Sequence, residues 1–171
     1  MIVHIPVARE PDRRMAPELK PPAHHMGTAV ADMEGMLEFY CDVLGFEVEV
    51  RAHQEEMTDE QFENARTLVD VPDGVFDVAF LDTPECNVEL LHFENPEAKE
   101  NVNSGSNSDV GTHHFAFEVE SAAEWYDYMS DVDEPDFEII SPPQDIGLTP
   151  RFWVYDPEDN VVEIIQEGQG E

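Results

Sequence analysis

The sequence predicts an α+β fold built from two related βαβββ modules, and three observations support this prediction. A short pattern occurs twice, at residues 24–30 (His-His-Met-Gly-Thr-Ala-Val) and at residues 113–119 (His-His-Phe-Ala-Phe-Glu-Val). Each copy is followed by a segment whose apolar residues have helical spacing. Each module then closes on an apolar strand with a glutamate in its middle, at 87–91 and at 161–165. We expect the two modules to form one structural domain.

Module one is predicted to span residues 23–95. A strand at 23–30 leads to Asp32, a plausible helix N-cap, and Gly45 is placed to end the helix that follows. Strands are expected at 46–50, 76–81 and 87–93, while the polar stretch 52–66 is either a helical excursion or a loop. The apolar residues of the predicted helix are Met33, Met36, Leu37, Tyr40, Val43 and Leu44.

Module two is predicted to span residues 111–168, after a polar linker at 96–110. The pattern from Ser121 to Glu124 is a capping box, which indicates the start of a helix. Strands follow at 136–140, 151–155 and 161–166, with a turn at 156–160. The apolar residues expected on the helix are Trp125, Tyr126, Met129 and Val132.

Residues 1–22 are predicted to form an N-terminal basic arm. They contain Arg9, Arg13, Arg14 and Lys20, which are four of the eight basic residues of the chain. We expect the arm to lie across an acidic surface, its own or that of a partner subunit, and a disordered tail is the alternative. An arm that reaches a neighbouring subunit would favour a homodimer.

The net charge limits the classes of partner. Forty acidic residues against eight basic ones give a formal charge of -32, which repels nucleic acid and anionic membrane surfaces. Neither is an expected partner, and a small-molecule substrate is. Such a charge also raises the possibility of disorder, but 41% hydrophobic residues in periodic segments favour a folded chain. The acidity is typical of a halophilic protein, because molar salt shortens the Debye length to about 3 Å.

The cysteines and the hydropathy pattern predict a cytoplasmic protein. Cys41 and Cys86 lie inside apolar runs, where buried free thiols are expected, although a disulfide is possible. No apolar stretch approaches the ~20 residues needed to cross a bilayer. The N-terminus lacks the features of a signal peptide.

Strand alternation indicates which side chains face a site. Phe115, Phe117 and Val119 share an apolar face that a helix would cover, so His114 lies on the opposite face. The same rule turns His25, Glu89 and Glu163 away from the helix-packed faces. Open space is expected beside these four residues, because their neighbours Gly27, Ala29 and Ala116 have small side chains.

Two imidazoles and two carboxylates, paired across a repeat, predict one metal site between the modules. Its ligands would be His25, Glu89, His114 and Glu163, a set that suits Ni²⁺, Co²⁺, Mn²⁺, Fe²⁺ or Zn²⁺. The alternative is structural histidines, with glutamates that face solvent on a wet sheet. His24 and His113 would point the other way, as strand-end residues hydrogen-bonded under a helix.

Residues 23–167 resemble the vicinal oxygen chelate superfamily, which includes glyoxalase I, methylmalonyl-CoA epimerase, extradiol dioxygenases and bleomycin-resistance proteins. The resemblance implies paired βαβββ modules whose mixed sheet curves around a metal-binding cleft, with ligands at the same four positions. Members commonly form dimers. The motifs that carry it are His25-Met26-Gly27, Phe39-Tyr40, Val43-Leu44-Gly45-Phe46, His113-His114, Asp156-Pro157 and Val162-Glu163-Ile164.

Differences within the superfamily favour its glyoxalase-like branch. Extradiol dioxygenases use two histidines and one glutamate, so Glu89 points to glyoxalase-like or epimerase-like members. Members that only bind antibiotics often lack the ligand set. Similar bacterial glyoxalases carry an arginine for the glutathione carboxylate where this chain has Ala29, so the thiol carrier need not be glutathione. Arg151 is a candidate for binding an anionic substrate, and a plain surface ion pair is the alternative.

The expected function is therefore a divalent-metal-dependent lyase or isomerase of glyoxalase type. It would act on a substrate with two adjacent oxygens, such as a 2-oxoaldehyde–thiol adduct, through a metal-stabilised enediolate. Glu163 or Glu89 would be the base that moves the proton. The alternatives are a methylmalonyl-CoA-type epimerase, an extradiol ring-cleaving dioxygenase and a non-catalytic binding or resistance protein.

Overall fold

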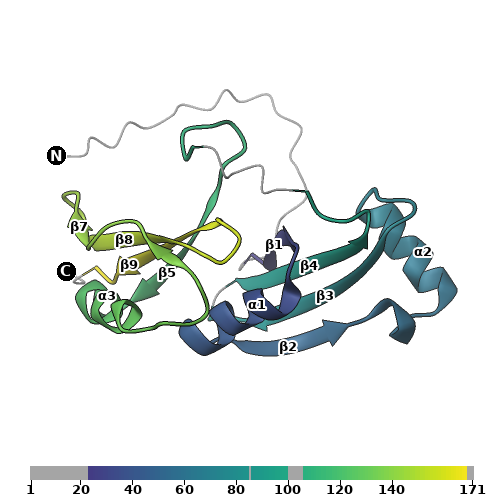
Figure 1. Ribbon diagram of the computed structural model, residues 1–171, viewed down its shortest axis with the longest axis horizontal. Coiled ribbons are helices and arrows are strands. Elements are labelled where there is room, and N and C mark those ends of the chain that lie inside the picture. Colours follow the sequence, from purple (N-terminus) through teal and green to yellow (C-terminus); the bar gives the residue numbers. More distant parts are fainter. Residues whose placement is uncertain (1–22, 85, 100–105, 169–171) are drawn as a thin grey trace, which may run out of the picture.

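The computed structural model describes residues 23–84, 86–99 and 106–168, so the predicted arm and part of the linker lie outside the described residues. The described chain forms two mixed sheets, with strand orders β1-β4-β3-β2 and β5-β9-β8-β6, and β7 pairs with β8 (Figure 1). This confirms the α+β class. The strands are β1 (His25–Val30), β2 (Glu47–Ala52), β3 (Val75–Asp82), β4 (Asn87–Asn95), β5 (His114–Val119), β6 (Glu138–Ile139), β7 (Gln144–Asp145), β8 (Pro150–Tyr155) and β9 (Val161–Gln166).

The first predicted helix is present and changes type along its length. It begins as α1 (Met33–Leu37) and continues as the π-helical segment η1 (Glu38–Val43). Asp32 is its N-cap, as predicted, because its side chain accepts a hydrogen bond from the Gly35 backbone N–H at 3.2 Å. Gly45 follows with φ 79°, a left-handed conformation that suits glycine and ends the helix.

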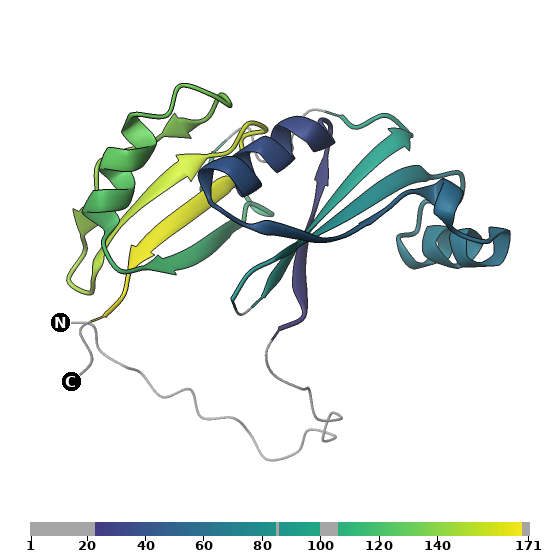
Figure 2. The same ribbon diagram turned by 90° about the horizontal axis from the view of Figure 1, so that it is seen from below.

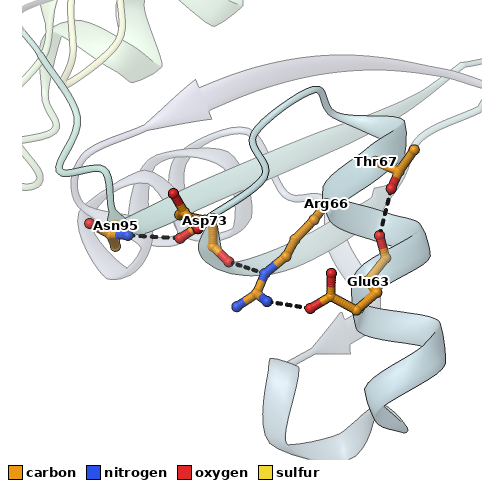
Figure 3. A network of polar contacts seen from close by, with 6 residues as sticks. Glu63, Arg66, Thr67, Asp73 and Asn95 are labelled. Atoms are coloured by element: carbon orange, nitrogen blue, oxygen red, sulfur yellow. Dashed lines mark hydrogen bonds and ion pairs between the residues drawn. The ribbon is translucent and has the colours of Figure 1, made fainter.

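The polar stretch after β2 is helical rather than a loop. A short 3-10 helix, η2 (Gln54–Glu56), precedes α2 (Asp59–Leu68), which lies at the far end of the first sheet in Figure 1. Figure 3 shows how α2 is tied to the following loop. Arg66 donates to the Gly74 carbonyl at 2.7 Å and to Glu63 at 2.6 Å, while Asn95 donates to the Asp73 carbonyl at 2.7 Å.

In module two, α3 (Ala122–Ser130) begins where the capping pattern predicted. Ser121 accepts a hydrogen bond from the Glu124 backbone N–H at 3.2 Å. The predicted strand at 136–140 is only two residues long, as β6, and β7 was not predicted. Prolines at 135, 142 and 143 surround these strands, and proline cannot donate a hydrogen bond to a ladder.

The two modules repeat each other at the level of strand register. In the parallel pair β1–β4, Gly27 lies opposite Glu89, and in the parallel pair β5–β9, Ala116 lies opposite Glu163. The antiparallel partner of each closing strand places an aromatic residue opposite the glutamate. Phe80 on β3 lies opposite Glu89, and Trp153 on β8 lies opposite Glu163. The sequence repeat therefore corresponds to a structural repeat, with the central glutamate of each closing strand in the same setting.

One hydrophobic core joins both modules. α1 and η1 lie at the junction of the two sheets (Figure 2), and the core cluster includes Val88 and Leu90 of β4 together with Val162 and Ile164 of β9. Polar contacts reinforce the junction. Tyr40 donates its hydroxyl to Asp156 Oδ2 at 3.1 Å.

The turn before β9 also supports α1 directly. Glu158 accepts hydrogen bonds from the backbone N–H groups of Ala31 and Asp32 at 2.6–2.9 Å. A carboxylate at the start of a helix satisfies donors that have no partner within the helix and interacts favourably with the helix dipole. Module two thus caps the helix of module one.

Candidate metal centre

The first half of the predicted site lies on the sheet of module one. His25 Nε2 is 3.3 Å from Glu89 Oε2, and the His25 ring lies edge-on to Phe80 with a centroid distance of 5.3 Å. A Cβ atom at Gly27 would approach Glu89 Oε2 to 2.8 Å, which is closer than such contacts normally are. Gly27 therefore leaves the space that the Glu89 carboxylate occupies.

The second half lies on the sheet of module two. His114 Nε2 is 3.1 Å from Glu163 Oε2, and the His114 ring lies 5.1 Å from that of Trp153. Arg151 Nη1 is 3.7 Å from the other carboxylate oxygen, Glu163 Oε1. Thr149 holds the guanidinium through its carbonyl and its hydroxyl, both at 3.1 Å. Arg151 has no counterpart in module one, where Val78 occupies the equivalent place on β3.

Each histidine–glutamate pair has a spacing that fits two ligands of one divalent ion. Two donor atoms about 2.1 Å from an ion, at right angles to each other, are about 3 Å apart. The observed separations of 3.3 and 3.1 Å meet that requirement. The histidine side chains are accessible, with His25 37% and His114 45% exposed, whereas those of Glu89 and Glu163 are 18% and 9% exposed. The residues therefore fit a metal in their chemistry and in their spacing within each pair.

The structure brings the four predicted ligands together as two pairs, not as one group. Over residues 23–84, 86–99 and 106–168, no three His, Cys, Asp or Glu side chains are close enough to hold an ion. Glu89 lies between the core residues Val88 and Leu90 of β4, and Glu163 lies between Val162 and Ile164 of β9. Because the common core lies between the sheets, each glutamate points away from it on its own sheet.

The two neighbouring histidines differ from the expectation, because neither is hydrogen-bonded under a helix. His24 precedes β1, so strand alternation does not determine its direction, and its Nδ1 lies 2.7 Å from His25 Nδ1. His113 does turn away from His114, with its ring 5.7 Å from that of Phe115 and its Nδ1 3.4 Å from the Gly111 carbonyl. His24 therefore belongs to the first half-site.

Sequence reasoning missed Phe80 and Trp153, the aromatic residues beside the two half-sites. Both are ordinary apolar residues of predicted strands, and only the strand register places them opposite Glu89 and Glu163. A weak signal existed. Each lies in the strand just before the glutamate strand, which pairs with it in an antiparallel hairpin.

Asp156 is a buried carboxyl group that supports the turn before β9 and not the half-sites. Burial raises the pKa of Asp156, while hydrogen bonds from Asn160, the Glu158 backbone and Tyr40 act in the opposite direction. Burial and the nearby Asp156 raise the pKa of Tyr40 well above its usual value. This buried network fixes the approach of β9 to η1.

Comparison with known proteins agrees with the fold. The sequence matches the Glyoxalase/Bleomycin resistance protein/Dioxygenase superfamily over residues 23–164. The chain belongs to this superfamily. Curated protein sequences give no match.

Solved structures show the same fold at low sequence identity. A glyoxalase family protein from Bacillus cereus is 17% identical, with a TM-score of 0.73 over 90% of this chain and 99% of that chain. The trypanothione-dependent glyoxalase I of Leishmania major is 19% identical, with a TM-score of 0.59 over 86% and 88%. Glyoxalase I from Zea mays is 21% identical, with a TM-score of 0.58 over 86% of this chain and 45% of that chain.

Two further expectations can be compared with the structure. Cys41 and Cys86 are free thiols, as expected, but they are half-buried rather than buried. No helix in the described part of the chain is long and apolar enough to span a membrane.

Proposed function

We propose that the protein is a divalent-metal-dependent lyase or isomerase of glyoxalase type that moves a proton between adjacent carbons of a small substrate. The observation that carries this proposal is the repeated half-site, a histidine and a glutamate 3.1–3.3 Å apart at the same register in both modules. Two structural ion pairs would not need the same register, the same face of the sheet and an aromatic neighbour in both modules. A shared role in holding one ligand accounts for all three.

A second copy of the chain would complete the site. Each half-site supplies two donors and faces away from the core of its own chain, so His25 and Glu89 of one copy can meet His114 and Glu163 of another. In a dimer with twofold symmetry, the half-site of module one in each copy would meet the half-site of module two in the other. Each homodimer would therefore contain two equal sites, each with four ligands. The proposed dimer therefore rests on the incompleteness of each half-site.

The residues of the chain would divide the work between binding and proton transfer. A bound divalent ion would supply Lewis-acid stabilisation of negative charge on the substrate oxygens. We assign the role of the base that moves the substrate proton to Glu163. Its Oε2 lies near His114, whereas its Oε1 faces Arg151 and is not turned toward His114. Arg151 would bind an anionic group of the substrate and release that oxygen. Glu89, confined beside Gly27, would remain a ligand.

The thiol carrier is expected to differ from glutathione. Ala29 stands where similar bacterial enzymes have a carboxylate-binding arginine, and relatives vary in this respect, since the Leishmania major enzyme is trypanothione-dependent. The acidic surface and the free thiols support a halophile's cytoplasm as the working environment.

A substrate panel with metal analysis tests the activity. We expect stoichiometric Ni, Co, Mn or Zn and turnover of 2-oxoaldehyde–thiol adducts without oxygen uptake. Glu163→Gln should lose turnover, and Arg151→Gln should raise KM for anionic substrates more than it lowers kcat. Epimerisation of acyl-CoA thioesters, or iron with oxygen uptake on catechols, would instead identify the other two enzyme classes. Binding of a small molecule without metal or turnover would identify a binding protein.

Subunit complementation tests the shared site. His25→Ala and His114→Ala should each lose most bound metal as pure proteins. When the two variants are unfolded and refolded together, random pairing should restore about a quarter of the sites, because each mixed dimer contains one intact set of four ligands. No recovery of metal or activity in the mixture would show that the site is not shared between copies.

A further inference from the structure

Two residues beyond each glutamate, the closing strands carry a large apolar side chain on the ligand face. In module one it is Leu91, about 7 Å along β4 from Glu89, and in module two it is Ile165, equally far along β9 from Glu163. Residues two apart in a strand share a face. A Cβ atom at Gly27 would lie 3.5 Å from Leu91 Cδ1, so Leu91 borders the space that holds the Glu89 carboxylate.

Each of these residues belongs to a row of four side chains, one from each of four neighbouring strands, and the two rows differ in character. The row of module one is apolar throughout and consists of Ala29, Leu91, Val78 and Ala52. The row of module two is mainly charged or polar and consists of Glu118, Ile165, Arg151 and Gln144. The same place beside the half-site is therefore an apolar wall in one module and a charged wall in the other.

The apolar wall of module one continues into a group of aromatic rings. Phe93 follows Leu91 on the same face and lies opposite Phe76, with ring centroids 5.2 Å apart. Phe62 of α2 packs against Phe76 at 5.5 Å, at the far end of the sheet in Figure 1. An apolar strip thus runs from Glu89 to α2, and its residues are Ala29, Ala52, Val78, Leu91, Phe76 and Phe93.

The strip is partly open to solvent. Leu91 and Phe93 are half-buried and Ala29 is exposed, whereas Val78 and Phe76 are 9% and 4% exposed. An uncovered apolar surface beside a few polar groups is typical of a ligand-binding site, and here it adjoins two metal ligands directly. A molecule held through its oxygens at the half-site would place its neighbouring carbon atoms on the strip.

We propose that this strip binds an alkyl or aryl group next to the vicinal oxygens of the substrate, while Arg151 holds the anionic end. The inference rests on the proposed function and deepens it, because it names the substrate class as adducts of long-chain or aromatic 2-oxoaldehydes. In the shared site, the strip would come from one copy and Arg151 from the other. The contrast between the two walls would therefore orient the substrate in one direction.

Binding of alkyl hydroxamates tests the strip without turnover, because these unreactive probes carry two adjacent oxygens. Calorimetry on the Ni²⁺-loaded full chain at molar KCl compares octanohydroxamate with acetohydroxamate. We expect the longer probe to bind at least about 50-fold more tightly, since burial of each methylene contributes a factor of about four and three buried methylenes suffice. Equal affinities of the two probes would overturn the inference.

The position of the alkyl group is tested with Leu91→Gln and its matched control, Ile165→Gln. Both residues are half-buried and occupy the same place in their rows. The ratio of the two affinities should fall at least about tenfold in Leu91→Gln and stay within about twofold in the control. An equal fall in both variants would overturn the assignment to module one.

A second variant, Ala29→Glu, keeps the test decisive if Leu91→Gln does not fold. Ala29 is exposed, so the change removes no core packing, and it gives module one the residue that Glu118 supplies at the equivalent place in module two. The affinity ratio should fall at least about fivefold, because a carboxylate beside the alkyl group would lose solvation on binding. An unchanged ratio would contradict the proposed strip.

Turnover of methyl-, hexyl- and phenylglyoxal adducts separates this inference from the proposed function. Affinity that rises with chain length, without turnover of any adduct, would reject the proposed activity and leave the strip as a binding surface. Turnover with equal kcat/KM for the three adducts and equal hydroxamate affinities would overturn the strip alone. Failure to bind any hydroxamate, together with no turnover, would overturn both.

Discussion

His24 is the residue for which the structure most changes the expectation. Its Nδ1 is 2.7 Å from His25 Nδ1, while the other ring nitrogen of His25 faces Glu89. A partner on the second nitrogen of a ligating histidine fixes its tautomer and orientation, and losing it weakens metal binding by about 10–100-fold. We predict such a loss for His24→Ala, measured by titration with Ni²⁺ or Zn²⁺.

The matched control for this variant is His113→Ala, which removes the corresponding histidine of module two. Its ring contacts Phe115 and turns away from the ligand face, so metal affinity should stay within about twofold of the unaltered chain. Equal effects of the two substitutions would contradict the supporting role of His24.

Asp156 should make stability depend on pH in a defined direction. Burial raises its pKa above the ordinary value of 3.8, so the folded chain holds this proton more tightly than the unfolded chain. That contribution is fully present below the ordinary pKa and is lost as the pH rises from there through the raised pKa. We predict that Asp156→Asn flattens the fall of Tm with pH above about pH 4.

Thermal melts at constant molar salt measure this slope. Asp159→Asn is the control, because it makes the same change three residues away in the same turn at an exposed side chain. An unchanged slope in Asp156→Asn would assign the pH dependence to the other carboxylates of the chain.

At the scale of elements, α1 depends on a cap from the other module. Glu158 accepts from the N–H groups of Ala31 and Asp32, and loss of a capping side chain typically costs about 1 kcal/mol. We predict that Glu158→Ala lowers Tm by about 2–4 °C, the size expected for a chain of 150–250 residues. Glu97→Ala, which removes the same charge from an exposed position, should not lower Tm.

Calorimetry of the two variants in parallel separates the cap from the charge. Removing any one acid from a chain of charge -32 relieves repulsion, so both variants share that effect. If Glu158→Ala is as stable as Glu97→Ala, the hydrogen bonds to the start of α1 contribute nothing measurable.

The helix ends that depend on residues close by in the sequence were predictable from the sequence. Asp32, Gly45 and Ser121 each act within a few residues, and each begins or ends its helix where predicted. The 52–66 stretch remained ambiguous, because α2 has no fully buried residue and therefore no strong apolar periodicity. Its position depends instead on contacts of Arg66 with the following loop.

At the scale of the whole molecule, charge should control stability. Forty acids and eight bases repel strongly once the Debye length is about 10 Å, as at 0.1 M salt, and much less at molar salt. We predict that Tm rises steadily from dilute buffer to molar KCl. A series of melts at increasing KCl tests this, and a flat or falling Tm would show that the acidic surface serves another purpose.

The sequence by itself determined the two modules, the strands that carry His25, Glu89, His114 and Glu163, and the faces of those strands. Side-chain direction in a strand alternates by local geometry, so no knowledge of the partner strand is needed. Tertiary structure decided the rest. It placed Phe80 and Trp153 opposite the glutamates and Arg151 against Glu163, and it divided the four predicted ligands between two sheets around one core. These are contacts between distant segments, which depend on register and packing, and a strand's own pattern does not contain that information.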